Sequence, residues 1–155
     1  MATSRVGAAI DALVAVLRAA PALEGVTVVD GPAVTNVTER RRLYVGWSPT
    51  ADQAAEIAQD FASAGARRRD EDFSINCYAE TRSGDKDMAL RRTAVFDLLA
   101  AVEVALRATD AQPEAPTLGG TVLWAHVSAG ALVQEQNPDG AMAMIPFTVT
   151  CRARL

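Results

Sequence analysis

Apolar residues near the start of the chain recur with the spacing of one helix face. Five of them fall at i, i+4, i+7, i+8 and i+11: Val6, Ile10, Leu13, Val14 and Leu17. This spacing predicts an amphipathic helix, which Thr3 or Ser4 can cap and Pro21 can end. Asp11 interrupts the apolar stretch and no basic leader frames it, so we interpret it as a helix and not as a signal peptide.

Short apolar runs and alternating positions predict strands in the segment that follows. Residues 26–29 form a β-branched run closed by turn-forming residues, and apolar and polar side chains alternate over residues 41–47. Residues 54–66 fit either a short helix by composition or a strand that carries Glu56 and Asp60 on a solvated side. We favour the strand.

The clearest strand signal lies at residues 73–80. Phe73, Ile75, Cys77 and Ala79 alternate there with polar or larger side chains. Alternation of this kind is typical of a half-buried antiparallel strand. The odd-numbered residues are therefore predicted to face the core.

A long helix is predicted after the turn at Ser83 and Gly84. Asp85 or Asp87 can cap it, and it is expected to run to about Thr109. One apolar stripe follows the helical period: Val95, Leu98, Leu99, Val102 and Leu106. Residues 111–120, with two prolines and a glycine pair, are predicted to form a loop.

The last third predicts a long β-hairpin, with residues 121–136 and 141–155 flanking a turn at residues 137–140. Alternation places Phe147 inward and Met144 outward. Phe147→Asp is therefore expected to prevent folding, and Met144→Asp to weaken assembly only. Because Pro146 cannot donate a backbone hydrogen bond, the hairpin must be an edge or bulged there. Residues 133–144 are expected to project beyond the domain body.

Together these elements predict one α+β domain over residues 1–155. It has an antiparallel-rich sheet, two amphipathic helices packed on one face and a long C-terminal β-hairpin. The other face of the sheet is left without helices. The alanine, methionine and proline content of residues 141–146 favours burial of that face against another subunit, so we expect an oligomer.

Composition narrows the possible functions. A net charge of −4 argues against a whole-surface affinity for DNA or anionic lipid, and no apolar run approaches the roughly 20 residues of a membrane span. Cys77 and Cys151 are expected to be buried free thiols. His126 has no nucleophile at a recognisable spacing, so we assign it a structural or interface role. The sequence predicts no enzyme activity, no catalytic residue, no cofactor and no metal site.

The densest charge block is Arg67-Arg68-Arg69 followed by Asp70-Glu71-Asp72. The arginines could hold a carboxylate or phosphate in bidentate fashion. The simpler interpretation is that adjacent opposite charges neutralise each other on a solvated loop. An ion-pair loop between subunits is a third possibility.

Several segments resemble a known family. They are Arg69-Asp70-Glu71-Asp72-Phe73-Ser74-Ile75-Asn76-Cys77, Leu118-Gly119-Gly120-Thr121-Val122, Gln134-Glu135-Gln136 and the final stretch from Phe147 to Leu155. With the order of elements, they resemble the tail terminator, or tail completion, proteins of long-tailed bacteriophages with actinobacterial hosts. The resemblance covers nearly the entire chain, and its motifs are structural and not catalytic.

The resemblance implies a structural virion protein in the neck region of the tail, assembled in the host cytoplasm and without a membrane partner. It implies a homo-oligomer, a hexameric ring, that caps the tail tube and ends its polymerisation. Its partners are then the tail-tube protein and the head-side connector protein. DNA would pass through the ring without specific binding, and we expect acidic residues to line the bore.

Seven residues are the candidates for the interface with other subunits or with the tube: Arg67, Arg68, Arg69, Gln134, Glu135, Met142 and Met144. Two other functions remain open. One is another head-tail joining protein or a tail-tube protein. The other, which we favour less, is a small-molecule-binding α+β domain with a pocket around His126, Trp124 or Tyr78.

Overall fold

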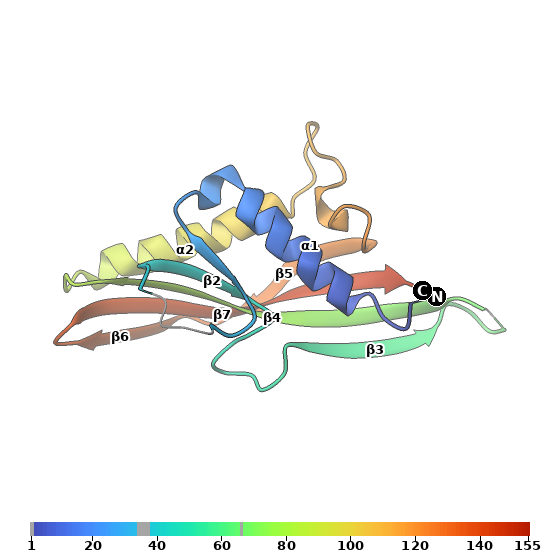
Figure 1. Cartoon of the computed structure of the whole chain (residues 1–155), viewed down its shortest axis with the longest axis horizontal. Helices are drawn as coiled ribbons and strands as arrows, with labels where there is room; N and C mark the ends of the chain where they lie inside the picture. The colour runs from blue at the N-terminus through green and yellow to red at the C-terminus, as the bar shows by residue number, and fades with distance from the viewer. Residues whose placement is uncertain (1, 34–37, 66) are drawn as a thin grey trace.

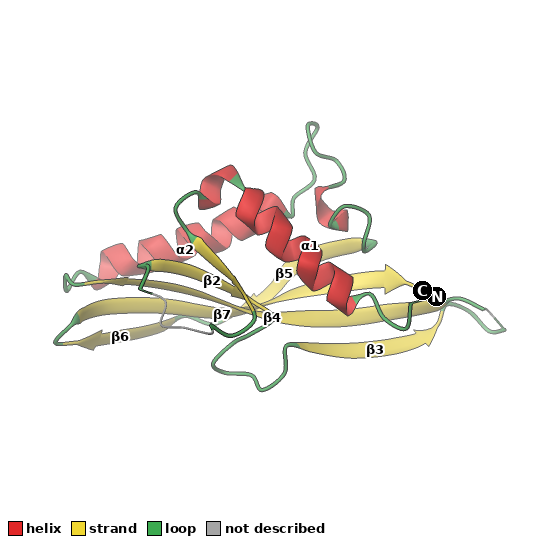
Figure 2. Cartoon of the chain, in the orientation of Figure 1, coloured by secondary structure: helices red, strands yellow, loops and turns green. Residues whose placement is uncertain are grey.

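The computed structural model describes residues 2–33, 38–65 and 67–155. Two helices lie on one side of a single sheet, so the protein has two layers (Figures 1 and 2). The elements are α1 (Val6–Ala19), β1 (Thr27–Asp30), β2 (Arg41–Val45), β3 (Ala55–Phe61), β4 (Arg69–Ser83), α2 (Met88–Ala105), β5 (Trp124–Gly130), β6 (Val133–Asn137) and β7 (Gly140–Arg154), with short 3-10 turns η1 (Pro21–Leu23) and η2 (Ala115–Thr117). The predicted α+β class is confirmed.

Two long strands, β4 and β7, form the centre of the sheet. They pair antiparallel over most of their length, from Asp70 opposite Arg154 to Ser83 opposite Ala141. In one half of the sheet β3 flanks β4 and β5 flanks β7; in the other half β2 and then β1 flank β4, and β6 flanks β7. Only the β1–β2 pair is parallel among the strand pairs of the described residues.

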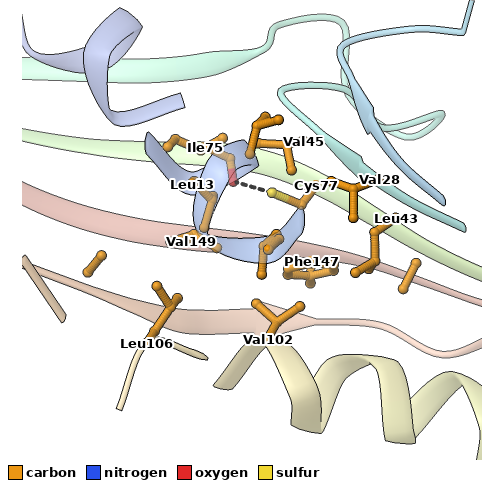
Figure 3. Packing of buried hydrophobic residues seen from close by; sticks show 14 of the residues in the cluster. Leu13, Val28, Leu43, Val45, Ile75, Cys77, Val102, Leu106, Phe147 and Val149 are labelled. Carbon is orange, nitrogen blue, oxygen red and sulfur yellow. Dashed lines mark hydrogen bonds between the residues drawn. The ribbon is translucent and has the colours of Figure 1, made fainter. Parts of the chain in front are cut away.

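The core lies between the sheet and the two helices. The odd-numbered residues of β4 predicted to face inward are buried, from Phe73 at 2% exposure to Ile75 and Cys77 at 0%. They pack with Phe147 and Val149 of β7 beneath the helices (Figure 3). Burying side chains of this size is the main favourable term in folding.

Helix α1 begins where sequence and tertiary contacts act together. The Ser4 hydroxyl accepts a hydrogen bond from the Val6 backbone N–H at 3.1 Å. The N-cap position, however, is Arg5, which makes no side-chain cap bond, so the prediction that Thr3 or Ser4 caps the helix is wrong. The Glu71 carboxylate of β4, which is 0% exposed, accepts the Arg5 N–H at 2.7 Å and a Gln59 amide at 2.6 Å. A carboxylate at a helix N-terminus offsets the positive end of the helix dipole.

Helix α2 begins as predicted, because the Asp87 side chain accepts the Leu90 N–H at 3.1 Å. The predicted stripe faces the core, with Val95 and Val102 at 0% exposure. The helix ends at Ala105, earlier than the expected Thr109. The Arg107 N–H bonds to the Val104 carbonyl, which is the tightened last turn common at helix ends.

The ambiguous segment 54–66 is a strand, β3, over Ala55–Phe61, so the interpretation we favoured is confirmed. Glu56 and Asp60 are exposed, as expected of its solvated side. The helical alternative is wrong because pairing with β4 decides the conformation of this alanine-containing stretch, and tertiary pairing overrides weak propensity.

The C-terminal hairpin has the break that Pro146 requires. Its outgoing strand divides into β5 and β6, with a bulge between Val127 and Ala129. The Pro146 carbonyl accepts the Ala131 N–H at 3.1 Å, so the backbone of Pro146 faces the interruption between the two strands. The missing proline N–H therefore removes no bond from the β4–β7 ladder.

The hairpin end is not a free arm, which corrects the prediction for residues 133–144. Strand β6 lies under the start of α2 (Figure 1), where Gln134 accepts a bond from Arg92 and Gln136 donates one to the Lys86 carbonyl. The returning residues Ala141 and Ala143 are buried beside β4. Fourteen residue pairs between β4 and β7 keep this end within the sheet.

Candidate assembly surfaces

His126 lies on β5, on the sheet face opposite the helices, and is exposed. Its ring centroid is 5.3 Å from that of Trp124. Its cross-strand neighbour Thr150 bonds to Ser128. Glu103 lines the same hollow as His126, but among the described residues no carboxylate hydrogen-bonds the imidazole. This arrangement fits a surface contact better than general base catalysis.

The thiols are buried and unreactive. Burial raises the pKa of both Cys77 and Cys151 to about 12, so the nucleophilic thiolate is scarce at neutral pH. In Figure 3 the Cys77 sulfur points to the Ile75 carbonyl inside the core. Across residues 2–33, 38–65 and 67–155, no three His, Cys, Asp or Glu side chains gather in a way that could hold a metal ion, and no helix has the length and apolarity of a membrane span.

A second apolar cluster lies on the sheet face that carries no helices. Tyr44, Trp47 and Tyr78 pack with ring centroids 4.9 to 5.8 Å apart, and Met144 joins them. Burial and the nearby Glu80 carboxylate raise the pKa of the Tyr78 hydroxyl. This aromatic cluster covers part of the face that the sequence pattern left open.

Met144 is therefore not an open interface residue, which corrects that expectation. It lies on the outward face as predicted, but it is only 6% exposed because the aromatic cluster surrounds it. Alternation assigns a residue to a face of the sheet, whereas burial depends on which distant strands bring neighbours to it. The nearby Met142 is half-buried and Glu135 is exposed.

An ion pair borders the aromatic cluster. The Arg42 guanidinium bonds the Glu80 carboxylate, and both side chains are about 10% exposed. Arg42 also donates to the Tyr44 hydroxyl at 3.3 Å. The sequence did not predict this pair, because Arg42 and Glu80 lie 38 positions apart and only strand pairing makes them neighbours.

The three arginines 67–69 occupy the turn between β3 and β4 and the first residue of β4. Arg67 and Arg68 are exposed. The turn between β3 and β4 lies at the end of the sheet near both chain termini (Figure 1). These arginines do not neutralise Asp70 as the sequence suggested. Asp70 bonds instead to Arg154 at 2.7 Å and to Arg152 at 3.0 Å, both on β7.

These two bonds make the protein's stability depend on pH. They lower the pKa of Asp70 from 3.8 to about 2, with the bond to Arg154 as the largest cause. A carboxylate with a lowered folded-state pKa contributes stability that is complete above its unfolded value and is lost as the pH falls toward the folded one. The contribution of Asp70 should therefore disappear between about pH 4 and pH 2.

We expect Asp70→Asn to unfold at lower urea concentration than the parent at pH 7. The gap between the two midpoints should be constant down to about pH 5, narrow below pH 4 and close near pH 2. Urea unfolding followed by circular dichroism across this range measures it. Asp72→Asn is the matched control, since Asp72 is 53% exposed and 3.8 Å from Arg152. A gap that persists unchanged at pH 2 would contradict the assignment.

Exposed apolar side chains lie on strand β3 and, on the other side of the sheet, beside strand β5. On β3, Ile57 is 53% and Phe61 65% exposed. On the opposite side, Phe96 of α2 is 47% and Leu132 38% exposed, at a hollow of about 270 Å³ between α2 and the β5–β6 break. The sequence reasoning missed these edges, because an exposed apolar residue carries no signal until the sheet order is known.

Comparison with known proteins adds a fold likeness. No protein-family model and no curated protein sequence matches the chain. Among solved structures, a chain described as part of the "virion of native gene transfer agent (GTA) particle" matches with a TM-score of 0.60. The match covers 99% of this chain and 100% of that chain at 13% sequence identity. This similarity shows a shared fold over the whole domain.

Proposed function

We propose that the protein is a structural component of a virion, and that it has no catalytic activity. The observation that carries the proposal is the full-length fold likeness to a chain of a gene transfer agent virion. Two features of the molecule agree with it. The described residues offer no catalytic grouping around His126, and exposed apolar residues such as Ile57 and Phe61 lie on an edge strand, where protein partners bind.

Within that role we propose the tail terminator position. The chain would form a homo-oligomeric, hexameric ring that sits on the last ring of tail-tube protein, ends tube polymerisation and contacts the head-side connector. The segment resemblance of residues 69–77, 118–122 and 147–155 to that family supports it. DNA would pass the ring without specific binding, in keeping with the net charge of −4.

Of the candidate contact residues, four are well placed for partners outside the chain. Arg67 and Arg68 are exposed at one end of the sheet, and Glu135 and the half-buried Met142 lie at the other. Candidate contact residues at both ends of the sheet suit a ring that contacts the tail-tube protein on one side and the head-side connector on the other. Arg69 is half-buried, and the exposed Gln134 is already bonded to Arg92.

The runner-up role is another head-tail joining protein or a tail-tube protein, which would have the same exposed edges. A small-molecule-binding domain is less supported, because the hollow beside His126 is shallow, about 220 Å³, and is lined by Glu103, Leu106, Arg107, His126 and Val127. Pockets for small molecules are ordinarily larger and more enclosed.

Deletion of the gene in the producing virus or element tests the terminator position. We expect overlong tail tubes without heads in electron micrographs, because nothing would stop tube growth, and restoration of normal particles by the gene supplied in trans. Particles with tubes of normal length but unattached heads would favour a joining protein. Absence of any tube would favour the tube subunit. Unchanged, infective or transducing particles would overturn the virion role.

A further inference from the structure

One half of the sheet has the strand order β3-β4-β7-β5, so β3 and β5 are its two open edges. The same rows of paired residues reach both edge strands. The pairing registers define rows across the sheet. One row runs from Glu56 of β3 through Ser74 of β4 and Thr150 of β7 to His126 of β5. An exposed carboxylate and an exposed imidazole therefore end the same row on the same face.

The unpaired backbone N–H and C=O groups of the two edge strands also lie on the same rows of the sheet. The Ala54 carbonyl accepts the Asn76 N–H, so the backbone N–H and C=O groups of even-numbered β3 residues point toward β4. The backbone groups of odd-numbered residues such as Ala55 and Ile57 point away from the sheet. On the other side, Leu155 and Arg69 exchange both backbone hydrogen bonds, so the backbone groups of odd-numbered β7 residues point toward β4. Those of even-numbered β7 residues therefore point toward β5.

His126 lies opposite the even-numbered Thr150 of β7, so the backbone N–H and C=O groups of His126 point toward β7. Its neighbours Ala125 and Val127 then point outward, away from the sheet. Level with them across the sheet lie Ile57 and Ala55, whose backbones also point outward. The unpaired donors and acceptors of the two edges thus fall on matching rows.

The strand directions agree with such a contact. Strand β3 runs antiparallel to β4, whereas β5 runs in the direction of β4 because both are antiparallel to β7. In a ring whose symmetry axis runs parallel to the strands, each copy is related to the next by rotation alone. The strand directions are then the same in every copy, so β3 of one copy would meet β5 of the next in antiparallel orientation. Because no translation along the strands is added, residues of the same row would face each other. Such a head-to-tail contact is the type that closes rings.

Side-chain sizes and hydrogen-bonding groups fit this pairing, in which residues of the same row face each other. Ile57 would lie opposite the small Ala125 on the helix-bearing face, and the exposed Trp124 opposite the small Ala58 on the other. Glu56 would lie opposite His126. A carboxylate can accept a hydrogen bond from an imidazole N–H, and cross-strand side-chain pairs that interact in this way stabilise a sheet.

We propose that β3 of one subunit pairs antiparallel with β5 of the next, with Glu56 opposite His126, so that the sheet continues from copy to copy. This inference rests on the proposed ring. It names the occupant of both edges as a second copy of this chain, and it removes two edges that would otherwise invite unspecific pairing.

Cysteine cross-linking tests the register. Glu56 and His126 would form a non-hydrogen-bonded pair, whose Cα atoms lie about 4.5 Å apart, within the range for a disulfide. Within one chain the two are separated by three strand spacings, about 14 Å, so they cannot link internally. The native thiols of Cys77 and Cys151 are buried, so they should not form cross-links of their own.

We expect the double variant Glu56→Cys/His126→Cys, oxidised mildly in its assembled form, to give a ladder of covalent oligomers on non-reducing gels. Each single variant should give none. Asp60→Cys/His126→Cys is the matched control: Asp60 is exposed on the same face, but lies about 13 Å farther along the strand, and should not link. Amide hydrogen exchange should also slow at Ala55 and Ile57 on assembly.

The outcomes separate the two proposals. Oligomers that form without the Glu56–His126 link, or that link as readily through Asp60, overturn the edge pairing and leave the ring intact. A chain that stays a single copy at every concentration, including in the presence of the tail-tube protein, overturns the proposed ring and the edge pairing with it.

Discussion

Phe147→Asp is expected to leave the protein without a native fold. Phe147 is 4% exposed and lies under the helices in the centre of the core (Figure 3). A carboxylate there loses its water and finds no partner, which costs more than about 4 kcal/mol, a large part of the stability of an ordinary domain. Far-ultraviolet circular dichroism and urea unfolding measure the loss.

Phe147→Leu is the matched control, because it keeps an apolar side chain and should cost less than about 1.5 kcal/mol. Met144→Asp is informative beside it. The sequence pattern predicts that this variant folds and only assembles poorly, but burial of Met144 in the aromatic cluster predicts a loss of about 2–3 kcal/mol in the single chain. Full stability of Met144→Asp would show that the cluster does not form.

Glu80→Ala should be the most damaging single change on the helix-free face. It removes one partner of a buried ion pair and leaves the Arg42 charge where only about 10% of the side chain reaches water. Breaking such pairs costs about 3–5 kcal/mol. The shift in the urea midpoint, with an unchanged slope, measures it.

Replacement of both partners distinguishes this cause from lost packing. Arg42→Met/Glu80→Leu removes both charges and fills similar volume, so it should recover most of the loss, since buried pairs contribute little net stability. Asp72→Ala on the same strand is the control and should cost less than about 1 kcal/mol, because its partner contact is exposed. A double variant as unstable as Glu80→Ala would contradict the argument.

Local patterns are enough to predict the elements wherever a periodic stretch is bounded by a residue that ends or caps it. The helical spacing of apolar residues from Val6 to Leu17, followed by Pro21, predicts α1, and the stripe that follows Asp87 predicts α2. The inward side of β4 and the break at Pro146 also follow from local rules: alternation assigns faces, and a residue without an N–H excludes a ladder bond.

Which residues come into contact depends on the folded arrangement of the strands and helices. Burial of Met144, the pairing of Arg42 with Glu80, the Glu71 cap on α1 and the bonds from β7 to Asp70 all join positions far apart in the chain. The row from Glu56 to His126 depends on three registers at once. Local patterns fix the face on which a side chain lies, but the neighbours that bury, charge or expose it come from strand order, which periodicity does not encode.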